Sequence, residues 1–193
     1  MESSSERLEK DLAILEAMAA EMEQYLREDI LFWRMAQGGM PMLTLGSYLM
    51  RQHRLVSLAS LLTPDQLARL NQAVAQYDAA LVEKVVRLEQ KGHTELDARL
   101  RQWSEYLNDA EWQRYPEYNN YANAVETRAM IAALLDQLNQ PPYELQPDRP
   151  ARLQQLDTLL RAHWESGEFI WPPDWQPAYP QARYWWLYGR PHN

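Results

Sequence analysis

Apolar residues recur at alternating intervals of four and three along the first 33 residues. This spacing places them on one face of a helix. Ser3 and Glu6 have the spacing of a capping box, and the Gly-Gly-Met-Pro sequence at 38–41 is typical of a helix end. We therefore predict a long helix over residues 5–37, whose apolar stripe contains one acid: Leu8, Leu12, Leu15, Ala19, Met22, Leu26, Asp29 and Trp33.

The length of this predicted helix bears on oligomeric state. It would measure about 50 Å at 1.5 Å per residue, whereas a compact domain of this chain length is only about 40 Å across. The helix must therefore kink, protrude from the domain or pair with a second chain. The pattern accordingly suggests self-association as a homodimer through residues 5–37.

Five further segments show helical patterns. Residues 42–62 are apolar around most of the helical circumference and carry no acid, which is typical of a buried central helix. Thr63-Pro-Asp-Gln66 has the sequence of a capped helix start. Four predicted helices follow. The first runs from Thr63 through Leu88 and stops at Gly92, and the others run from Thr94 to before Pro116, from Asn119 or Asn120 to Leu138, and from about Pro150 to Gly167.

The C-terminal segment has a different composition. Five of the eight tryptophans lie between Trp164 and Tyr188, and the prolines at positions 172, 173, 177 and 180 disfavour helix there. The fold class is therefore all-α: a single-domain bundle of five or six helices over residues 1–167, with an extended aromatic tail over 168–193 packed across it.

Three arrangements of this aromatic tail are open. Its rings can fill grooves of the same chain, bridge to a partner chain, or present Trp171-Pro-Pro173 as a polyproline-type ligand. We favour the first, because a large exposed aromatic surface is an aggregation hazard. The tail residues that we expect to be buried or to form an interface are Trp171, Trp175, Trp185 and Trp186.

Charge and composition exclude several classes of protein. The formal net charge of −8 disfavours nucleic acid and anionic membranes as partners. The sequence contains no cysteine, which excludes disulfides and thiolate chemistry. The polar start at residues 1–6 is unlike a secretory signal, and the longest uncharged run, 35–50, is too short to span a membrane. We therefore expect a cytoplasmic protein without a membrane span.

A charged cluster is the first candidate binding site. Arg51 and His53 lie on the apolar segment 42–62, and Asp29 lies on the stripe of the preceding helix. If the two helices are antiparallel, Asp29 reaches the depth of Arg51 or His53. Such a cluster is either an ion pair that sets the helix register, which we favour, or a polar pocket with Arg51 as an anion contact.

A helix–helix corner at 115–121 is the second candidate site, because the hydroxyls of Tyr118 and Tyr121 could line a ligand pocket. A turn rich in cap-forming residues is the simpler interpretation, and we favour it. The sequence has no Glu-x-x-His and no His-x-x-x-His, so we expect neither a metal site nor a cofactor. No glycine-rich phosphate loop or nucleophile elbow is present either.

The leading hypothesis for function is a non-enzymatic interaction or assembly protein that binds a protein partner or a second copy of itself. The alternative is a helical-bundle ligand-binding protein or enzyme with a polar pocket near Asp29 and His53. A solvent-reachable cavity at these residues, on which polar groups converge, would favour the alternative.

Overall fold

Helices form most of the protein in the computed structural model, which describes residues 3–109 and 120–192. Within these ranges the C-terminal segment adds a two-stranded antiparallel sheet and two 3₁₀ turns. The prediction of an all-α fold with an extended aromatic C-terminal segment is confirmed. The elements are α1 (Ser4–Arg27), α2 (Leu45–Ser57), η1 (Ala59–Leu61), α3 (Pro64–Leu81), α4 (Val85–Asn108), α6 (Tyr121–Leu138), α7 (Asp148–Arg161), β1 (Trp164–Phe169), η3 (Pro173–Ala178), η4 (Trp185–Leu187) and β2 (Tyr188–Pro191).

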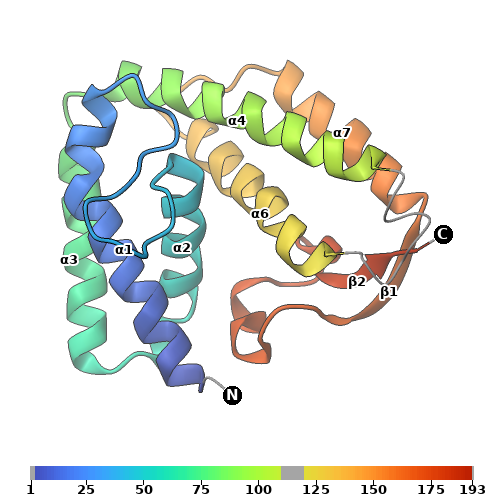
Figure 1. Ribbon diagram of the computed structural model, residues 1–193, viewed down its shortest axis with the longest axis horizontal. Coiled ribbons are helices and arrows are strands. Elements are labelled where there is room, and N and C mark those ends of the chain that lie inside the picture. The colour runs from blue at the N-terminus through green and yellow to red at the C-terminus, as the bar shows by residue number, and fades with distance from the viewer. Residues whose placement is uncertain (1–2, 110–119, 193) are drawn as a thin grey trace.

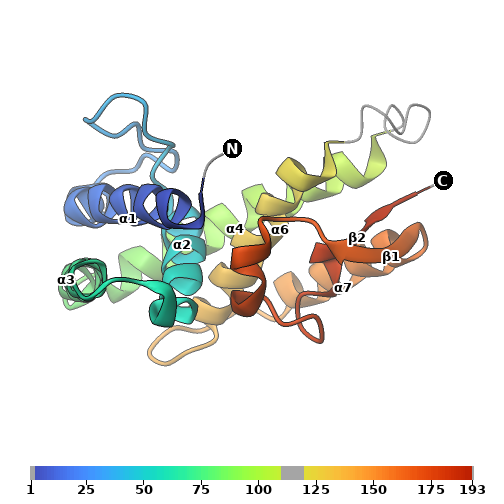
Figure 2. The same cartoon turned by 90° about the horizontal axis from the view of Figure 1, so that it is seen from below.

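The helices pack in two groups that share α2 and α4 (Figure 1). α1 lies along α3, and α2 packs against both α1 and α6. α4 crosses the molecule and packs against α6 and α7. Viewed from below, the C-terminal segment covers the open side of α2 and α6, while the loop between α1 and α2 projects away from the body (Figure 2).

The first helix is shorter than predicted. α1 ends at Arg27, and Glu28 already has extended backbone angles. Trp33 pairs with Leu43 in an isolated antiparallel bridge instead of continuing the helix. Glu21 holds this loop, because its carboxylate accepts hydrogen bonds from Trp33 Nε1 at 2.7 Å and from the amide of Ala36 at 2.9 Å. The apolar periodicity beyond Arg27 was therefore misleading, since tertiary hydrogen bonds shape this segment.

The apolar stripe of α1 packs against other helices of the same chain. Leu8, Leu12, Leu15 and Met22 are buried, and α1 packs against α2 and α3. A helix of 24 residues is about 36 Å long and fits within the body. The length argument for a homodimer through residues 5–37 therefore no longer holds.

The next helix boundaries also differ from the prediction. The buried central helix is confined to α2, which is shorter than 42–62, and the η1 turn after it has no buried residue. α3 ends at Leu81, and α4 then runs through Gly92 without interruption. A Cβ on Gly92 would lie 3.1 Å from Leu138 Cδ2, so this glycine permits close packing of α4 on α6. It does not end a helix.

The last helix ends six residues before Gly167, because residues 164–169 form β1, which pairs with β2. Gly189 faces Ser166 in this pairing with a φ of +139°. A Cβ at position 189 would lie 2.1 Å from the carbonyl oxygen of Glu165, so only glycine fits. Among the described residues, every helix is too short or too polar to cross a bilayer.

Candidate functional site

A buried ion pair joins α1, α2 and the C-terminal segment. Arg54 is only 2% exposed, and its Nη1 lies 2.8 Å from Asp11 Oδ2. Arg51 contacts the other oxygen of the same carboxylate, with Nε 3.2 Å from Oδ1. The pair of arginines thus shares one carboxylate that is itself buried.

Aromatic residues of the C-terminal segment cover this pair. The guanidinium of Arg54 lies 3.6 Å from the ring centre of Trp175, and its Nε donates to the hydroxyl of Tyr179 at 3.1 Å. Burial alone would lower the pKa of Arg54, but the neighbouring Tyr179 and Asp11 raise it. Arg54 therefore stays charged and ties the C-terminal segment to the helices.

The predicted pairing of Asp29 with Arg51 or His53 was wrong. Asp29 lies after the end of α1, its side chain is 90% exposed, and it pairs with Arg87 at 2.8 Å. Asp11 takes its place because it lies one helical turn from Leu8 and Leu15, on the buried face of α1. Arg51 is committed to Asp11 and to the hydroxyl of Ser47, 2.6 Å from its Nη1, so it is not a free anion contact.

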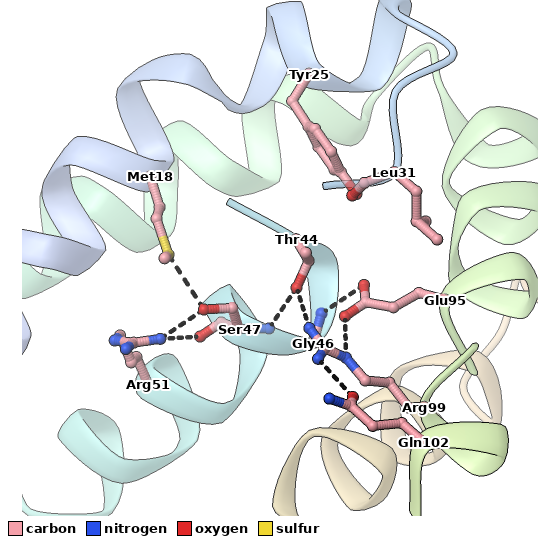
Figure 3. Close-up of polar contacts among 10 residues, drawn as sticks. All are labelled: Met18, Tyr25, Leu31, Thr44, Gly46, Ser47, Arg51, Glu95, Arg99 and Gln102. Carbon is pink, nitrogen blue, oxygen red and sulfur yellow. Dashed lines mark hydrogen bonds and ion pairs between the residues drawn. The ribbon is translucent and has the colours of Figure 1, made fainter. Parts of the chain in front are cut away.

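A second buried cluster holds the N-terminus of α2 (Figure 3). Glu95 of α4 is fully buried, and its Oε2 accepts a hydrogen bond from the amide of Gly46 at 3.0 Å. Its Oε1 accepts from Arg99 Nε at 3.2 Å, while Arg99 Nη2 donates to the N-cap residue Thr44 at 3.3 Å. A carboxylate at a helix N-terminus is stabilised by free amides and by the helix dipole. This cluster, which sequence reasoning missed, positions α2.

His53 points to the opposite side of α2 from Arg51, toward the C-terminal segment. Its Nε2 lies 2.8 Å from the carbonyl oxygen of Ala178 and 3.2 Å from the hydroxyl of Tyr184. Because a carbonyl can only accept, Nε2 carries the proton and Nδ1 is left as an acceptor in the neutral ring. Burial lowers the pKa of His53, which favours this neutral form at physiological pH.

His53 also lines a solvent-reachable groove of about 460 Å³. One face of α2, the last turns of α6, Gln140 just after α6 and one residue of the C-terminal segment form its walls. Gln52 Oε1 is buried in this wall and accepts no hydrogen bond from any residue that the structure describes. The lining residues are Leu49, Gln52, His53, Val56, Ser57, Ala133, Asp136, Gln137, Gln140 and Arg183. We refer to this feature as the His53 groove.

Tyr121 of the predicted tyrosine corner does not line the groove. Tyr121 is buried in the core, where its hydroxyl donates to the carbonyl oxygen of Trp186 at 2.5 Å. Burial raises the pKa of Tyr121 well above its usual value. Tyr118 lies outside the described residues.

The four tail tryptophans pack on their own chain to different extents. Trp171 and Trp186 are buried, and Trp171 Nε1 donates to the carbonyl oxygen of Ala122 at 3.0 Å. Trp175 and Trp185 are only partly buried, although both contact the core. The expected packing within the chain is therefore found, and an additional role of the partly exposed rings at an interface stays a prediction.

No cluster of three or more His, Asp and Glu side chains arranged to hold a metal occurs among residues 3–109 and 120–192. No protein-family model, curated protein or solved structure was found to match the chain.

Proposed function

We propose that the protein binds a small polar molecule in the His53 groove. The observation that supports this proposal is the convergence of polar side chains from α2, α6 and the C-terminal segment on one solvent-reachable cavity. A volume of about 460 Å³ lies within the range of small-molecule sites. This is the alternative hypothesis from the sequence, with Asp136 and Arg183 in place of Asp29.

The unpartnered oxygen of Gln52 adds to the case for a ligand. Its Oε1 is closed to solvent and has no partner among the described residues, which destabilises the fold; a rotation of the Gln52 side chain toward the groove would let a bound donor remove that cost. The Nε2 of His53 is bonded to the carbonyl oxygen of Ala178, so we assign His53 to shaping the site. The proposal is one of binding.

A thermal-shift screen of the full chain tests this proposal. The panel consists of small amines, amides, alcohols and carboxylates at millimolar concentration, since any ligand that binds only the folded state raises the melting temperature. Gln52→Leu keeps the volume of the side chain and removes its polar atoms. Gln72→Leu, on the exposed face of α3, is the matched control.

We expect compounds that raise the melting temperature of the wild type to act equally on Gln72→Leu and more weakly on Gln52→Leu. The proposal fails if no compound in the panel shifts the wild type. It also fails if every active compound acts equally on the two variants.

Self-association through the loop at 28–44 is a second candidate function. Ile30, Phe32 and Met42 are exposed on this loop, although its backbone is held by fixed contacts. Lys91 Nζ donates to the carbonyl oxygen of Ile30 at 2.5 Å, and the hydroxyl of Tyr25 donates to the carbonyl oxygen of Leu31 at 3.0 Å. A rigid loop with exposed apolar side chains resembles a preformed contact surface, since ordering it on association costs little.

Sedimentation velocity of the wild type and of Phe32→Ser measures this association. A wild type that dimerises and a variant that does so more weakly would support the loop as the contact. A wild type that stays monomeric at high concentration would refute it.

A further inference from the structure

One ion pair separates the His53 groove from a second cavity. Asp136 of α6 and Arg183 of the C-terminal segment line both the groove and a neighbouring cavity of about 160 Å³. The second cavity is more apolar, because Ala132, Leu135, Leu153 and Trp186 form part of its wall. The side chains of this ion pair therefore stand between a polar space and an apolar one.

The Asp136–Arg183 ion pair is exposed, so Arg183 can leave Asp136 and another cation can take its place. The side chains of Asp136 and Arg183 are 49% and 56% exposed. Surface ion pairs contribute little to stability, because water solvates the separated charges nearly as well. The backbone of Arg183 is held by a 3.1 Å hydrogen bond from its amide to the carbonyl oxygen of Pro180. The guanidinium can therefore leave Asp136 without unfolding the segment.

The groups around this pair favour a cationic ligand. With Arg183 withdrawn, the remaining charge at the junction is the carboxylate of Asp136, which lines both cavities. A carboxylate accepts hydrogen bonds and requires donors. Arg128, the other cation of the second cavity, is already neutralised by two hydrogen bonds of 3.0 and 2.9 Å to Asp157. An anion would be repelled by Asp136 and by the net charge of −8.

We propose that the ligand is a primary amine or a guanidine with a short apolar chain, and that its cationic head takes the place of Arg183 at Asp136. The chain enters the second cavity beside Leu153 and Trp186. Arg183 then acts as an internal competitor that occupies the carboxylate when no ligand is bound. This inference rests on the proposed function, because it names the ligand class of the same groove.

Calorimetric titration of the full chain with three probes tests the ligand class: n-butylguanidinium, the neutral n-butylurea and the anion pentanoate. The variants are Arg183→Ala, which removes the competitor, and Asp136→Asn, which removes the acceptor charge. Arg190→Ala is the matched control, since Arg190 is also an exposed arginine of the C-terminal segment that pairs with an acid, Glu165 at 3.8 Å, outside the groove. Circular dichroism verifies that each variant is folded.

We expect the wild type to bind n-butylguanidinium in preference to the other two probes. Arg183→Ala should bind it more tightly, by up to roughly five-fold, which is the upper value for loss of an exposed ion pair. Asp136→Asn should bind it more weakly, by up to roughly five-fold for the same reason, and Arg190→Ala should match the wild type.

Two results would overturn the inference in distinguishable ways. If n-butylurea or pentanoate binds as well as the cation, or if the Arg183→Ala and Asp136→Asn variants leave the cation's affinity unchanged, the ligand class is wrong and the groove remains a binding site. If none of the three probes binds the wild type or Arg183→Ala, and the compound panel is also inactive, both proposals fail.

Discussion

Asp11→Ala removes the one carboxylate that Arg51 and Arg54 share beneath the C-terminal segment. Arg54 Nη1 lies 2.8 Å from this carboxylate and Arg51 Nε lies 3.2 Å from it. The variant leaves the buried guanidinium of Arg54 and the partly buried one of Arg51 without their shared carboxylate. The rings of Trp175 and Tyr179 remain in place, but a ring face compensates a buried charge less well than a carboxylate does.

The size of the effect follows from burial. Breaking a buried ion pair by removing one partner costs about 3–5 kcal/mol. For a chain of this size each kcal/mol corresponds to a fall of about 2–4 °C in melting temperature, so we expect a loss of about 6–20 °C. Asp29→Ala is the control, because its exposed pair with Arg87 contributes about 1 kcal/mol or less.

Urea unfolding followed by circular dichroism measures the loss of stability for both variants. Tryptophan emission at low urea reports whether the C-terminal segment detaches first, because Trp171 and Trp175 would then enter water. We expect Asp11→Ala to lose the segment before the helices unfold. If Asp11→Ala is no less stable than Asp29→Ala, the buried pair does not hold the segment and the reasoning is wrong.

Three further predictions follow from single positions. Gly46→Ala should destabilise the fold by about 1–3 kcal/mol in thermal melts, because its Cβ would lie 2.7 Å from Glu95 Oε1; an unchanged melting temperature would contradict this. Gly189→Ala should cost about 2–3 kcal/mol by the same measurement, since its φ is +139° and its Cβ would meet Glu165 O at 2.1 Å. His53 has a lowered pKa, so the unfolded chain takes up its proton first, and stability should fall as the pH drops below about 6.5. His53→Gln should have a shallower pH slope in urea unfolding between about pH 7 and 5, and equal slopes would refute this.

Local sequence signals predicted the starts of α1, α3 and α6 well, although the predicted start of α4 at Thr94 lies nine residues after the observed one at Val85. Ser3 with Glu6 and Thr63 with Gln66 both form the capping boxes that their spacing indicates. These interactions span three residues, so the sequence itself contains all of their partners. The start of α6 at Tyr121 was likewise predicted to within two residues.

Helix ends were predicted less well, because tertiary contacts decide them. Residues 28–37 contain no glycine or proline, and the loop after Arg27 is shaped by hydrogen bonds from Trp33 and Ala36 to Glu21. Gly92 is a helix-ending residue by propensity, but here it lets α4 approach Leu138. Propensity cannot distinguish a glycine that ends a helix from one that accommodates a neighbour.

The residues of the candidate site could likewise be predicted only in part from the sequence. The sequence singled out His53 because it is a histidine on a strongly apolar segment, and it does line the groove. Asp136 and Arg183 reach the groove from α6 and from the C-terminal segment, at sequence distances of 83 and 130 residues from His53. No spacing rule connects residues that separate elements bring together, so only the structure could identify them.

The covering of Arg54 has a consequence for how the protein is made. Asp11 and Arg54 lie early in the sequence, whereas Trp171, Trp175 and Tyr179 are synthesised after α7, the last described α-helix. A nascent chain can thus assemble its α-helices while this charged pair still faces water, and the pair is covered only when residues 171–179 have left the ribosome. A chain truncated before Trp171 would contain the α-helices but would expose the Arg54 side of α2 to water. Quality-control proteases could distinguish it from the longer chain by this exposed surface.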